Sequence, residues 1–119
     1  MDKVRKVKVS MQVVIGDDNV ENLKDLETLL LQYGACYPDV SFDMETYSDA
    51  SVLLRKIQRE KPADLYILDI VMSRITGIDL GYEIRKKSEE SIIIYITASD
   101  GFALDAYNIF AIRYLLKPV

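Results

Sequence analysis

The hydrophobic and polar positions of this chain follow two alternating spacings. Continuous apolar runs or strict alternation, the patterns of β-strands, occur in five segments: residues 9–15, 40–47, 64–69, 92–97 and 112–116. Apolar residues three or four apart, the pattern of an amphipathic helix, occur between them in four segments: residues 20–33, the stretch between Ser48 and Pro62, residues 77–87, and a short helix starting at Ser99 or Asp100. The sequence therefore predicts five strands separated by four helices.

Helix ends are marked by residues with capping preferences. We expect Gly34 to end the first helix, because glycine is the commonest residue just after a helix. We expect Ser48 to cap the second helix, because its hydroxyl can accept a hydrogen bond from a free backbone N–H. The second helix should end before Pro62, since the residue that precedes a proline disfavours the helical conformation.

Strands that alternate with helices are typical of a parallel sheet. The first, third and fourth strands are largely apolar, which predicts a sheet covered by helices on both faces. Right-handed crossovers then favour a flavodoxin-like, doubly wound α/β fold with five parallel strands in the order 2-1-3-4-5.

The two ends of the chain shape its expected domain organisation. Residues 1–8 are a basic lead-in, and residues 9–119 should form one domain. The sequence stops almost at the end of the fifth strand, so the usual last helix is missing and apolar surface should be uncovered on one face. We expect a piece of a longer protein, truncated after strand five, or alternatively a homodimer that covers this face.

Composition narrows the chemistry. The 119 residues contain no histidine, which excludes Ser-His-Asp and Cys-His nucleophile systems and His-ligated metal sites. The formal net charge of −4 argues against direct nucleic-acid binding, and no apolar run is long enough to cross a membrane. A lone cysteine, Cys36, and no export signal together predict a cytoplasmic location.

Candidate functional residues gather where the strands end. In this fold ligands bind beyond the carboxyl ends of the strands, between strands one and three. Four strands lead to such residues: Asp17 and Asp18, then Asp69, Thr97 and Lys117. Each alone is commonly a cap, a turn residue or a solvated side chain, but their convergence on one edge favours a functional site.

Three neighbouring carboxylates require a cation, because a pair 4 Å apart repels by about 4 kcal/mol at an effective dielectric of 20. Carboxylate oxygens and water are the ligands that Mg²⁺ prefers, and a phosphoryl oxygen normally completes the set. Lys117 and Thr97 can contact further phosphoryl oxygens, and Asp69 is the natural acceptor, as an aspartyl phosphate. Such a site requires positioning and charge neutralisation rather than a general base.

These residues also resemble a known family. The matching set is Asp17-Asp18, the run Leu68–Met72, Gly77, Thr97-Ala98 and Lys117-Pro118, and it is similar to the receiver (CheY-like) domain of two-component response regulators over residues 10–118. The resemblance implies that Asp69 accepts a phosphoryl group from the phosphohistidine of a sensor histidine kinase, that Lys117 contacts this group, and that the Lys117–Pro118 bond is cis. The magnesium ligands that it implies are Asp17, Asp18, Asp69 and the backbone carbonyl of Val71.

The same resemblance implies a conformational switch. Thr97 is the hydroxyl that moves to meet the phosphoryl group, and Tyr114 is the aromatic residue that then turns inward, changing the surface of the fourth helix and fifth strand. Residues 96–107 and 114–118 look most like receivers of the LytTR class. In that class a DNA-binding domain follows the receiver, so the implied partners are a histidine kinase and a transcription-regulating output domain in the parent chain.

Four positions depart from the family pattern or tune it. Ser73 stands where the family often has Pro, and Thr76 where it often has Asn or Asp, which predicts a less constrained loop after strand three. Val71, which faces the attacking water, and Ser99, which is small, are predicted to set the lifetime of the aspartyl phosphate.

Other protein classes remain alternatives to a module that catalyses only its own phosphorylation and dephosphorylation. A haloacid-dehalogenase-type phosphatase also uses an aspartate nucleophile, Mg²⁺ and a lysine, but it needs an acid where this chain has Val71. A flavodoxin needs a Ser/Thr/Gly-rich phosphate loop after strand one, where residues 16–19 are acidic. A degenerate receiver used only for docking is the third alternative.

Overall fold

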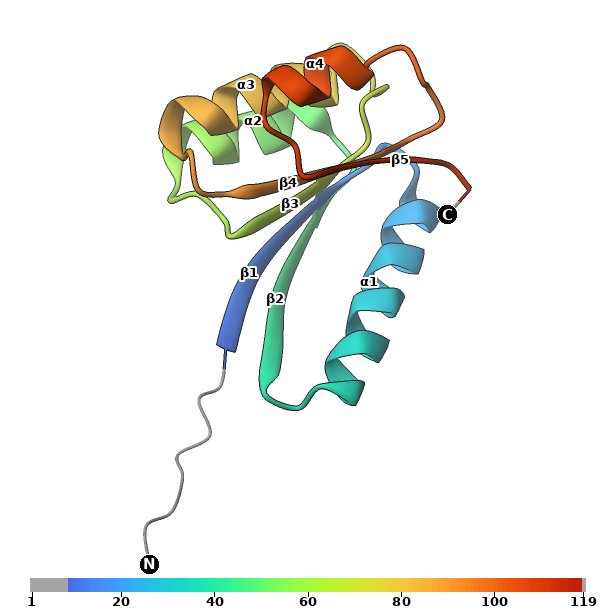
Figure 1. The fold of residues 1–119 in the computed structure, drawn as a ribbon, viewed down its shortest axis with the longest axis vertical. Coiled ribbons are helices and arrows are strands. Elements are labelled where there is room, and N and C mark those ends of the chain that lie inside the picture. The colour runs from blue at the N-terminus through green and yellow to red at the C-terminus, as the bar shows by residue number, and fades with distance from the viewer. Residues whose placement is uncertain (1–8, 119) are drawn as a thin grey trace, which may run out of the picture.

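The computed structural model describes residues 9–118, so the expected basic lead-in at residues 1–8 lies outside the described residues. Strands and helices alternate along this part of the chain (Figure 1). The elements are β1 (Val9–Gly16), α1 (Val20–Cys36), β2 (Val40–Tyr47), α2 (Ala50–Arg59), β3 (Leu65–Leu68), α3 (Gly77–Lys87), β4 (Ile92–Thr97), α4 (Ala103–Asn108) and β5 (Arg113–Leu116).

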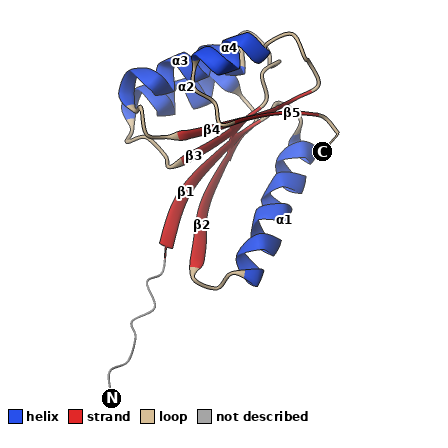
Figure 2. Ribbon diagram, in the orientation of Figure 1, coloured by secondary structure: helices blue, strands red, loops and turns tan. Residues whose placement is uncertain are grey.

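The strands form one parallel sheet in the order β2-β1-β3-β4-β5 (Figure 2). The chain leaves β1 toward β2 on one side and then crosses to β3 on the other side of β1. The switch point therefore lies between β1 and β3, where a doubly wound fold places its ligand. The predicted fold class and strand order are confirmed.

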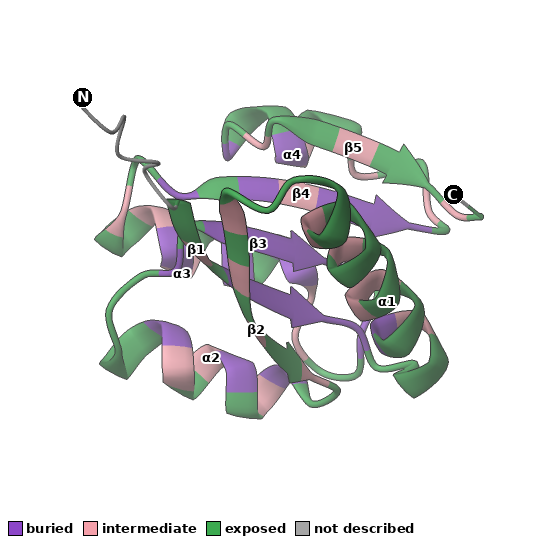
Figure 3. Cartoon of the chain, turned by 90° about the horizontal axis from the view of Figure 1, so that it is seen from below, coloured by how far each residue is buried: buried purple, intermediate pink, exposed green. Residues whose placement is uncertain are grey.

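Helices lie on both faces of the sheet (Figure 1). α2, α3 and α4 cover one face over the larger hydrophobic cluster, which includes Leu53, Leu80 and Ile109. α1 covers the other face over a smaller cluster that includes Ile15, Leu23 and Ile67. β3 and most of β4 are buried between these layers (Figure 3), as their apolar sequences predict.

Part of the α1 face is open. Within residues 9–118, α1 is the only helix on this face, and it packs mainly against β1 and β2 (Figure 1). Ile92 and Leu115 are each 37% exposed, and Leu29 of α1 is 56% exposed. Apolar side chains are thus uncovered there, as expected, while the truncation and the homodimer stay predictions. No helix in the described part of the chain has the length and apolar character needed to cross a bilayer.

The end of α1 differs from the prediction. The helix does not stop at Gly34 but continues to Cys36, and the N–H of Tyr37 donates to the carbonyls of Tyr33 and Gly34 at 3.2 and 3.3 Å. No glycine among the described residues has a positive φ, so Gly34 does not serve as a left-handed cap. Pro38 ends the helix instead, because it disfavours the helical conformation at the residue before it.

The starts of two helices also differ from the prediction. Asp49 rather than Ser48 caps α2, and its carboxylate accepts the N–H of Ser51 at 2.8 Å. α4 begins at Ala103 rather than just after Ser99 or Asp100, and no side chain caps it. Ser99 is held in the preceding loop because its N–H donates to the hydroxyl oxygen of Thr97 at 3.3 Å.

Two glycines allow α3 to approach the sheet closely. A Cβ at Gly77 would lie 2.1 Å from the backbone oxygen of Asp69, and one at Gly81 would lie 2.2 Å from the hydroxyl of Tyr95. Tyr95 is completely buried, and its hydroxyl donates to the carbonyl of Gly77 at 2.8 Å. The first turn of α3 is therefore seated directly against Asp69, the residue that follows β3.

We expect the stability of the fold to fall in alkaline solution, in part through Tyr95. Burial raises the pKa of Tyr95 far above its ordinary value. Above about pH 10 the unfolded chain loses the phenolic proton while the folded chain keeps it, so the free energy of unfolding falls by about 1.4 kcal/mol per pH unit for this group. Urea titrations on the alkaline side should show a shallower decline in Tyr95→Phe than in the wild type; parallel declines would contradict this expectation.

The guanidinium of Arg85, in the last turn of α3, joins segments that are distant in the sequence. It donates to the carbonyls of Ser88 and Ser91 at 3.2 and 2.6 Å, ahead of β4. It also donates to the carbonyls of Ile109 and Phe110 at 2.6 and 3.2 Å, just after α4. Within residues 9–118 it forms no ion pair. Arg85 thus ties the C-terminal end of α4 to that of α3.

Candidate functional site

Asp17 follows β1 directly and is almost completely buried, with 3% of its side chain exposed. Its backbone N–H donates to the carbonyl of Tyr47 at 3.1 Å, which extends the pairing of β1 with β2 by one residue. The chain then turns sharply, because Asn19 caps α1 and its N–H donates to Oδ1 of Asp17 at 2.9 Å. Asp18, between them, is left exposed at the sheet edge.

Asp69 follows β3 in the same way. Its N–H donates to the carbonyl of Gly16 at 2.8 Å, which places it beside the end of β1. Its Oδ1 accepts the N–H of Val71 at 3.3 Å, and 9% of its side chain is exposed. The Val71 side chain itself is 55% exposed, so at this position the backbone, rather than the side chain, contacts the carboxylate.

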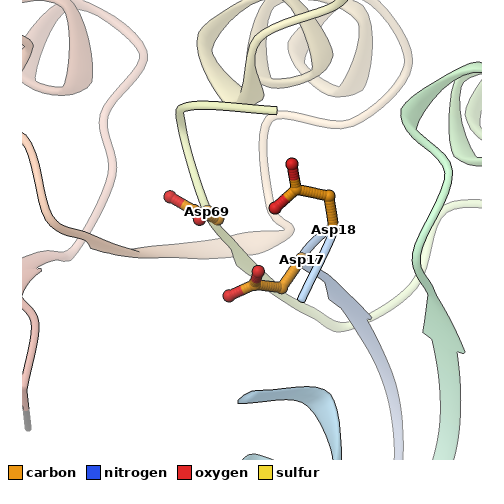
Figure 4. A group of neighbouring side chains, drawn as sticks. All are labelled: Asp17, Asp18 and Asp69. Carbon is orange, nitrogen blue, oxygen red and sulfur yellow. The ribbon is translucent and has the colours of Figure 1, made fainter. Parts of the chain in front are cut away.

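The carboxylates of Asp17, Asp18 and Asp69 form one cluster (Figure 4). One oxygen from each lies within 4.8 Å of the others. The two buried members and the one exposed member together present only hard oxygen donors, which suit Mg²⁺ and similar cations. The residues present therefore fit a divalent metal that remains open to solvent on the Asp18 side.

Lys117 brings a positive charge into this cluster. Its backbone N–H donates to the carbonyl of Thr97 at 2.8 Å, which continues the pairing of β4 with β5. Its Nζ lies 2.8 Å from Oδ2 of Asp17 and 3.0 Å from Oδ2 of Asp69. Burial opposes the charged ammonium, but hydrogen bonds to Asp17 and Asp69 outweigh it, so the pKa of Lys117 lies above its ordinary value. The Lys117–Pro118 bond is cis, as expected.

Thr97 and Tyr114 lie beside the cluster rather than in it. Thr97 is completely buried, and its hydroxyl oxygen accepts the N–H of Ser99 at 3.3 Å. The Tyr114 hydroxyl donates to the carbonyl of Ser99 and accepts the N–H of Phe102, the latter at 3.4 Å. Both side chains thus contact the loop between β4 and α4. The structure brings the three aspartates and Lys117 together and places Thr97 and Tyr114 on this neighbouring loop.

The loop from β3 to α3, which Ser73 and Thr76 predict to be less constrained, ends in a hydrogen-bonded helix cap. Thr76 caps α3 in a capping box, in which its hydroxyl accepts the N–H of Asp79 at 3.1 Å and the Asp79 carboxylate accepts the N–H of Thr76 at 3.0 Å. Arg74, earlier in the loop, has a positive φ of 70°, an uncommon conformation for a residue with a side chain.

Sequence reasoning missed one residue of the site. Asn22, in the first turn of α1, donates from its side-chain amide to Oδ2 of Asp17 at 3.3 Å. The signal was available, because an amide in the first turn after Asp17 lies on the helix end that faces the carboxyl ends of the strands. A lone Asn near a helix start is usually part of a cap, however, so its position alone does not assign it to the site.

Comparison with known proteins identifies the family. The family model of the response regulator receiver domain matches residues 13–119. Among curated relatives, the sensory transduction protein LytR of Streptococcus mutans is 30% identical over 109 residues, which cover 91% of this chain and 43% of LytR. The chain therefore spans less than half the length of this relative.

Solved structures agree with this match. The response regulatory domain of mrkE from Klebsiella pneumoniae superposes with a TM-score of 0.79 at 25% identity, covering 92% of this chain and 84% of that one. The response regulator TrrA of Thermotoga maritima, solved in complex with Mg(2+)-BeF, gives a TM-score of 0.68 at 28% identity, covering 90% of this chain and 86% of that one. The chain belongs to the response regulator receiver domain family, with LytTR-class proteins among its relatives.

Proposed function

We propose that this chain is a phosphorylation-controlled switch in which Asp69 accepts a phosphoryl group from a histidine kinase. The observation that carries the proposal is the pair of contacts from Lys117 Nζ to Asp17 and Asp69, inside a cluster of three carboxylates. Such a cluster holds one nucleophilic oxygen next to a fixed positive charge. The chain's membership of the receiver family supports the same conclusion.

In this proposal Mg²⁺ binds to Asp17, Asp18, Asp69 and the backbone carbonyl of Val71. The hard oxygen donors of the cluster and their proximity support this assignment, as does the complex of the related TrrA with Mg(2+)-BeF. When bound, the ion neutralises negative charge on the cluster and on the phosphoryl oxygens. Asp18, which is exposed, leaves an open side through which a donor approaches.

The transfer requires only positioning and charge. An oxygen of Asp69 forms a bond to phosphorus while the P–N bond of the donor phosphohistidine breaks, and its electron pair leaves with the imidazole. Lys117, 3.0 Å from Oδ2 of Asp69, then contacts a phosphoryl oxygen. Water then attacks phosphorus and breaks the bond between phosphorus and the Asp69 oxygen, which releases inorganic phosphate and restores the carboxylate. We attribute the rate of this step to Val71 and Ser99.

The switch acts through the loop between β4 and α4. The Thr97 hydroxyl accepts a bond from Ser99, so its own hydrogen is free to be donated to a phosphoryl oxygen. Movement of Thr97 would carry the Ser99 carbonyl, to which the Tyr114 hydroxyl donates. The signal thus passes to α4 and β5, which face the partner in our proposal: an output domain in a longer parent protein, with DNA binding as its expected activity.

Incubation with acetyl phosphate and Mg²⁺ tests this function. Acetyl phosphate transfers its phosphoryl group by cleavage of its P–O bond, with acetate leaving, and needs no protein partner. Intact mass spectrometry should show the addition of one phosphoryl group that is lost on standing and that requires Mg²⁺. Borohydride reduction followed by peptide mapping should place the group on Asp69. A group on another residue, or no adduct at all, would contradict the proposal.

A further inference from the structure

Asn22 contacts Asp17 from a position that the helix start holds firmly. Asn19 caps α1 through its side-chain oxygen, which accepts the backbone N–H groups of Glu21 at 2.9 Å and Asn22 at 3.2 Å. The side-chain amide of Asn22 then points to Oδ2 of Asp17 at 3.3 Å. A carboxylate carries no hydrogen, so the amide nitrogen must be the donor in this contact.

Both oxygens of the buried Asp17 carboxylate accept hydrogen bonds. Oδ1 accepts the N–H of Asn19, while Oδ2 accepts two donors, the charged Nζ of Lys117 at 2.8 Å and the neutral amide of Asn22. Lys117 divides its contacts between Asp17 and Asp69. Asn22 makes no other side-chain hydrogen bond within the described residues, so its amide serves Asp17 alone.

The two donors on Oδ2 differ in how they affect a bound cation. The ammonium of Lys117 repels Mg²⁺ and competes with it for the carboxylate, whereas an amide orients the carboxylate without adding charge. In the proposed phosphorylated state Lys117 contacts a phosphoryl oxygen, and its hydrogen bond to Asp17 is weakened. Asn22 belongs to α1 and would keep its bond to Oδ2.

We propose that Asn22 is a positioning residue that holds the Asp17 carboxylate in its metal-binding orientation. This inference rests on the proposed function, because it assumes that Asp17 is a ligand of Mg²⁺. In this inference Asn22 touches neither the metal nor the phosphoryl group, and it acts only through its hydrogen bond to Asp17. Asn22 and Lys117 also line the same hollow of about 250 Å³ beside Asp17, so the amide can be changed without disturbing the hydrophobic core.

Titration calorimetry with Mg²⁺ tests the role of Asn22 directly. Asn22→Ala should weaken the affinity for Mg²⁺ about tenfold, as is typical when a ligand loses the group that orients it. Asn22→Gln keeps an amide on a longer side chain and should bind Mg²⁺ more tightly than Asn22→Ala. Thr28→Ala, an exposed site on the same helix, is the matched control and should bind as the wild type does.

Measurements of stability and of phosphorylation rate distinguish a positioning role of Asn22 from a general effect on the structure. Without metal, Asn22→Ala loses the hydrogen bond to the buried Asp17 carboxylate but gains helix propensity, so its urea midpoint should stay close to that of the wild type. With acetyl phosphate, Asn22→Ala should need more Mg²⁺ for half-maximal rate but reach the wild-type rate at saturating Mg²⁺.

Two results would overturn the inference: equal Mg²⁺ affinities in the wild type and Asn22→Ala, or a loss of affinity that Asn22→Gln does not reduce. A wild-type protein that binds Mg²⁺ but takes no phosphoryl group would overturn the proposed function instead, while the comparison of affinities would still decide the role of Asn22.

Discussion

Asp69→Asn is expected to abolish the phosphoryl adduct while leaving the fold intact. The amide has the shape of the carboxylate, and its oxygen can still accept the N–H of Val71. It has no anionic oxygen to attack phosphorus, so acetyl phosphate with Mg²⁺ should give no adduct detectable by intact mass spectrometry. The substitution also removes one of three neighbouring negative charges, which should weaken the binding of Mg²⁺.

Asp64→Asn is the matched control for this experiment. Asp64 precedes β3 as Asp69 follows it, is exposed, and accepts the N–H of Gln12 through its side chain at 2.8 Å. The same change of acid to amide at the opposite end of the strand should leave the adduct unchanged. An adduct of normal yield in Asp69→Asn would show that another residue is the acceptor.

Gly77→Ala should cause the largest loss of stability of any conservative change near the site. The added Cβ would meet the backbone oxygen of Asp69 at 2.1 Å and its carbonyl carbon at 2.9 Å. Because both atoms belong to the backbone, no side-chain rotation relieves the clash, and α3 must move away from the sheet. We expect the free energy of unfolding to fall by about 3 kcal/mol, the upper range for an overpacked site, as measured by urea denaturation.

Gly34→Ala is the corresponding control within a helix. A Cβ at Gly34 would meet the ring of Phe42 at 3.7 Å, an ordinary van der Waals distance. Since alanine forms helices better than glycine, this variant should be more stable by up to about 1 kcal/mol. The two variants thus make the same chemical change with opposite expected signs. Equal effects would mean that the seating of α3 against Asp69 does not determine stability.

The fold could be predicted because its strongest patterns agree with one another. α3 begins and ends where its apolar spacing predicts, and Ile92–Thr97 forms β4 as its unbroken apolar run predicts. The start of α2 could not be predicted, because it depends on which of several competent residues accepts the backbone N–H of the first turn. Ser48 and Asp49 can both cap a helix, and the structure uses Asp49. The start of α4 could not be predicted either, because no side chain caps it.

The sequence predicts which residues meet at the site, but it does not predict which of their atoms form hydrogen bonds. Parallel strands bring Asp17, Asp69 and Lys117 to one edge, and strand order alone predicts their proximity. Whether Lys117 bonds to one aspartate or to both depends on side-chain geometry that no spacing encodes. The contribution of Asn22 depends on the turn between β1 and α1, which sets the direction in which the first turn of the helix faces.

The contacts of Arg85 make the two ends of α4 unequal. Its acceptors are backbone carbonyls, which do not titrate, so this attachment persists in acid solution where carboxylate ion pairs are lost. The opposite end of α4, at Phe102, has no side-chain cap and lies next to the loop that contacts Tyr114. α4 is therefore attached more firmly at its C-terminal end, and its amide protons should exchange with solvent first at the end that faces the phosphorylation site.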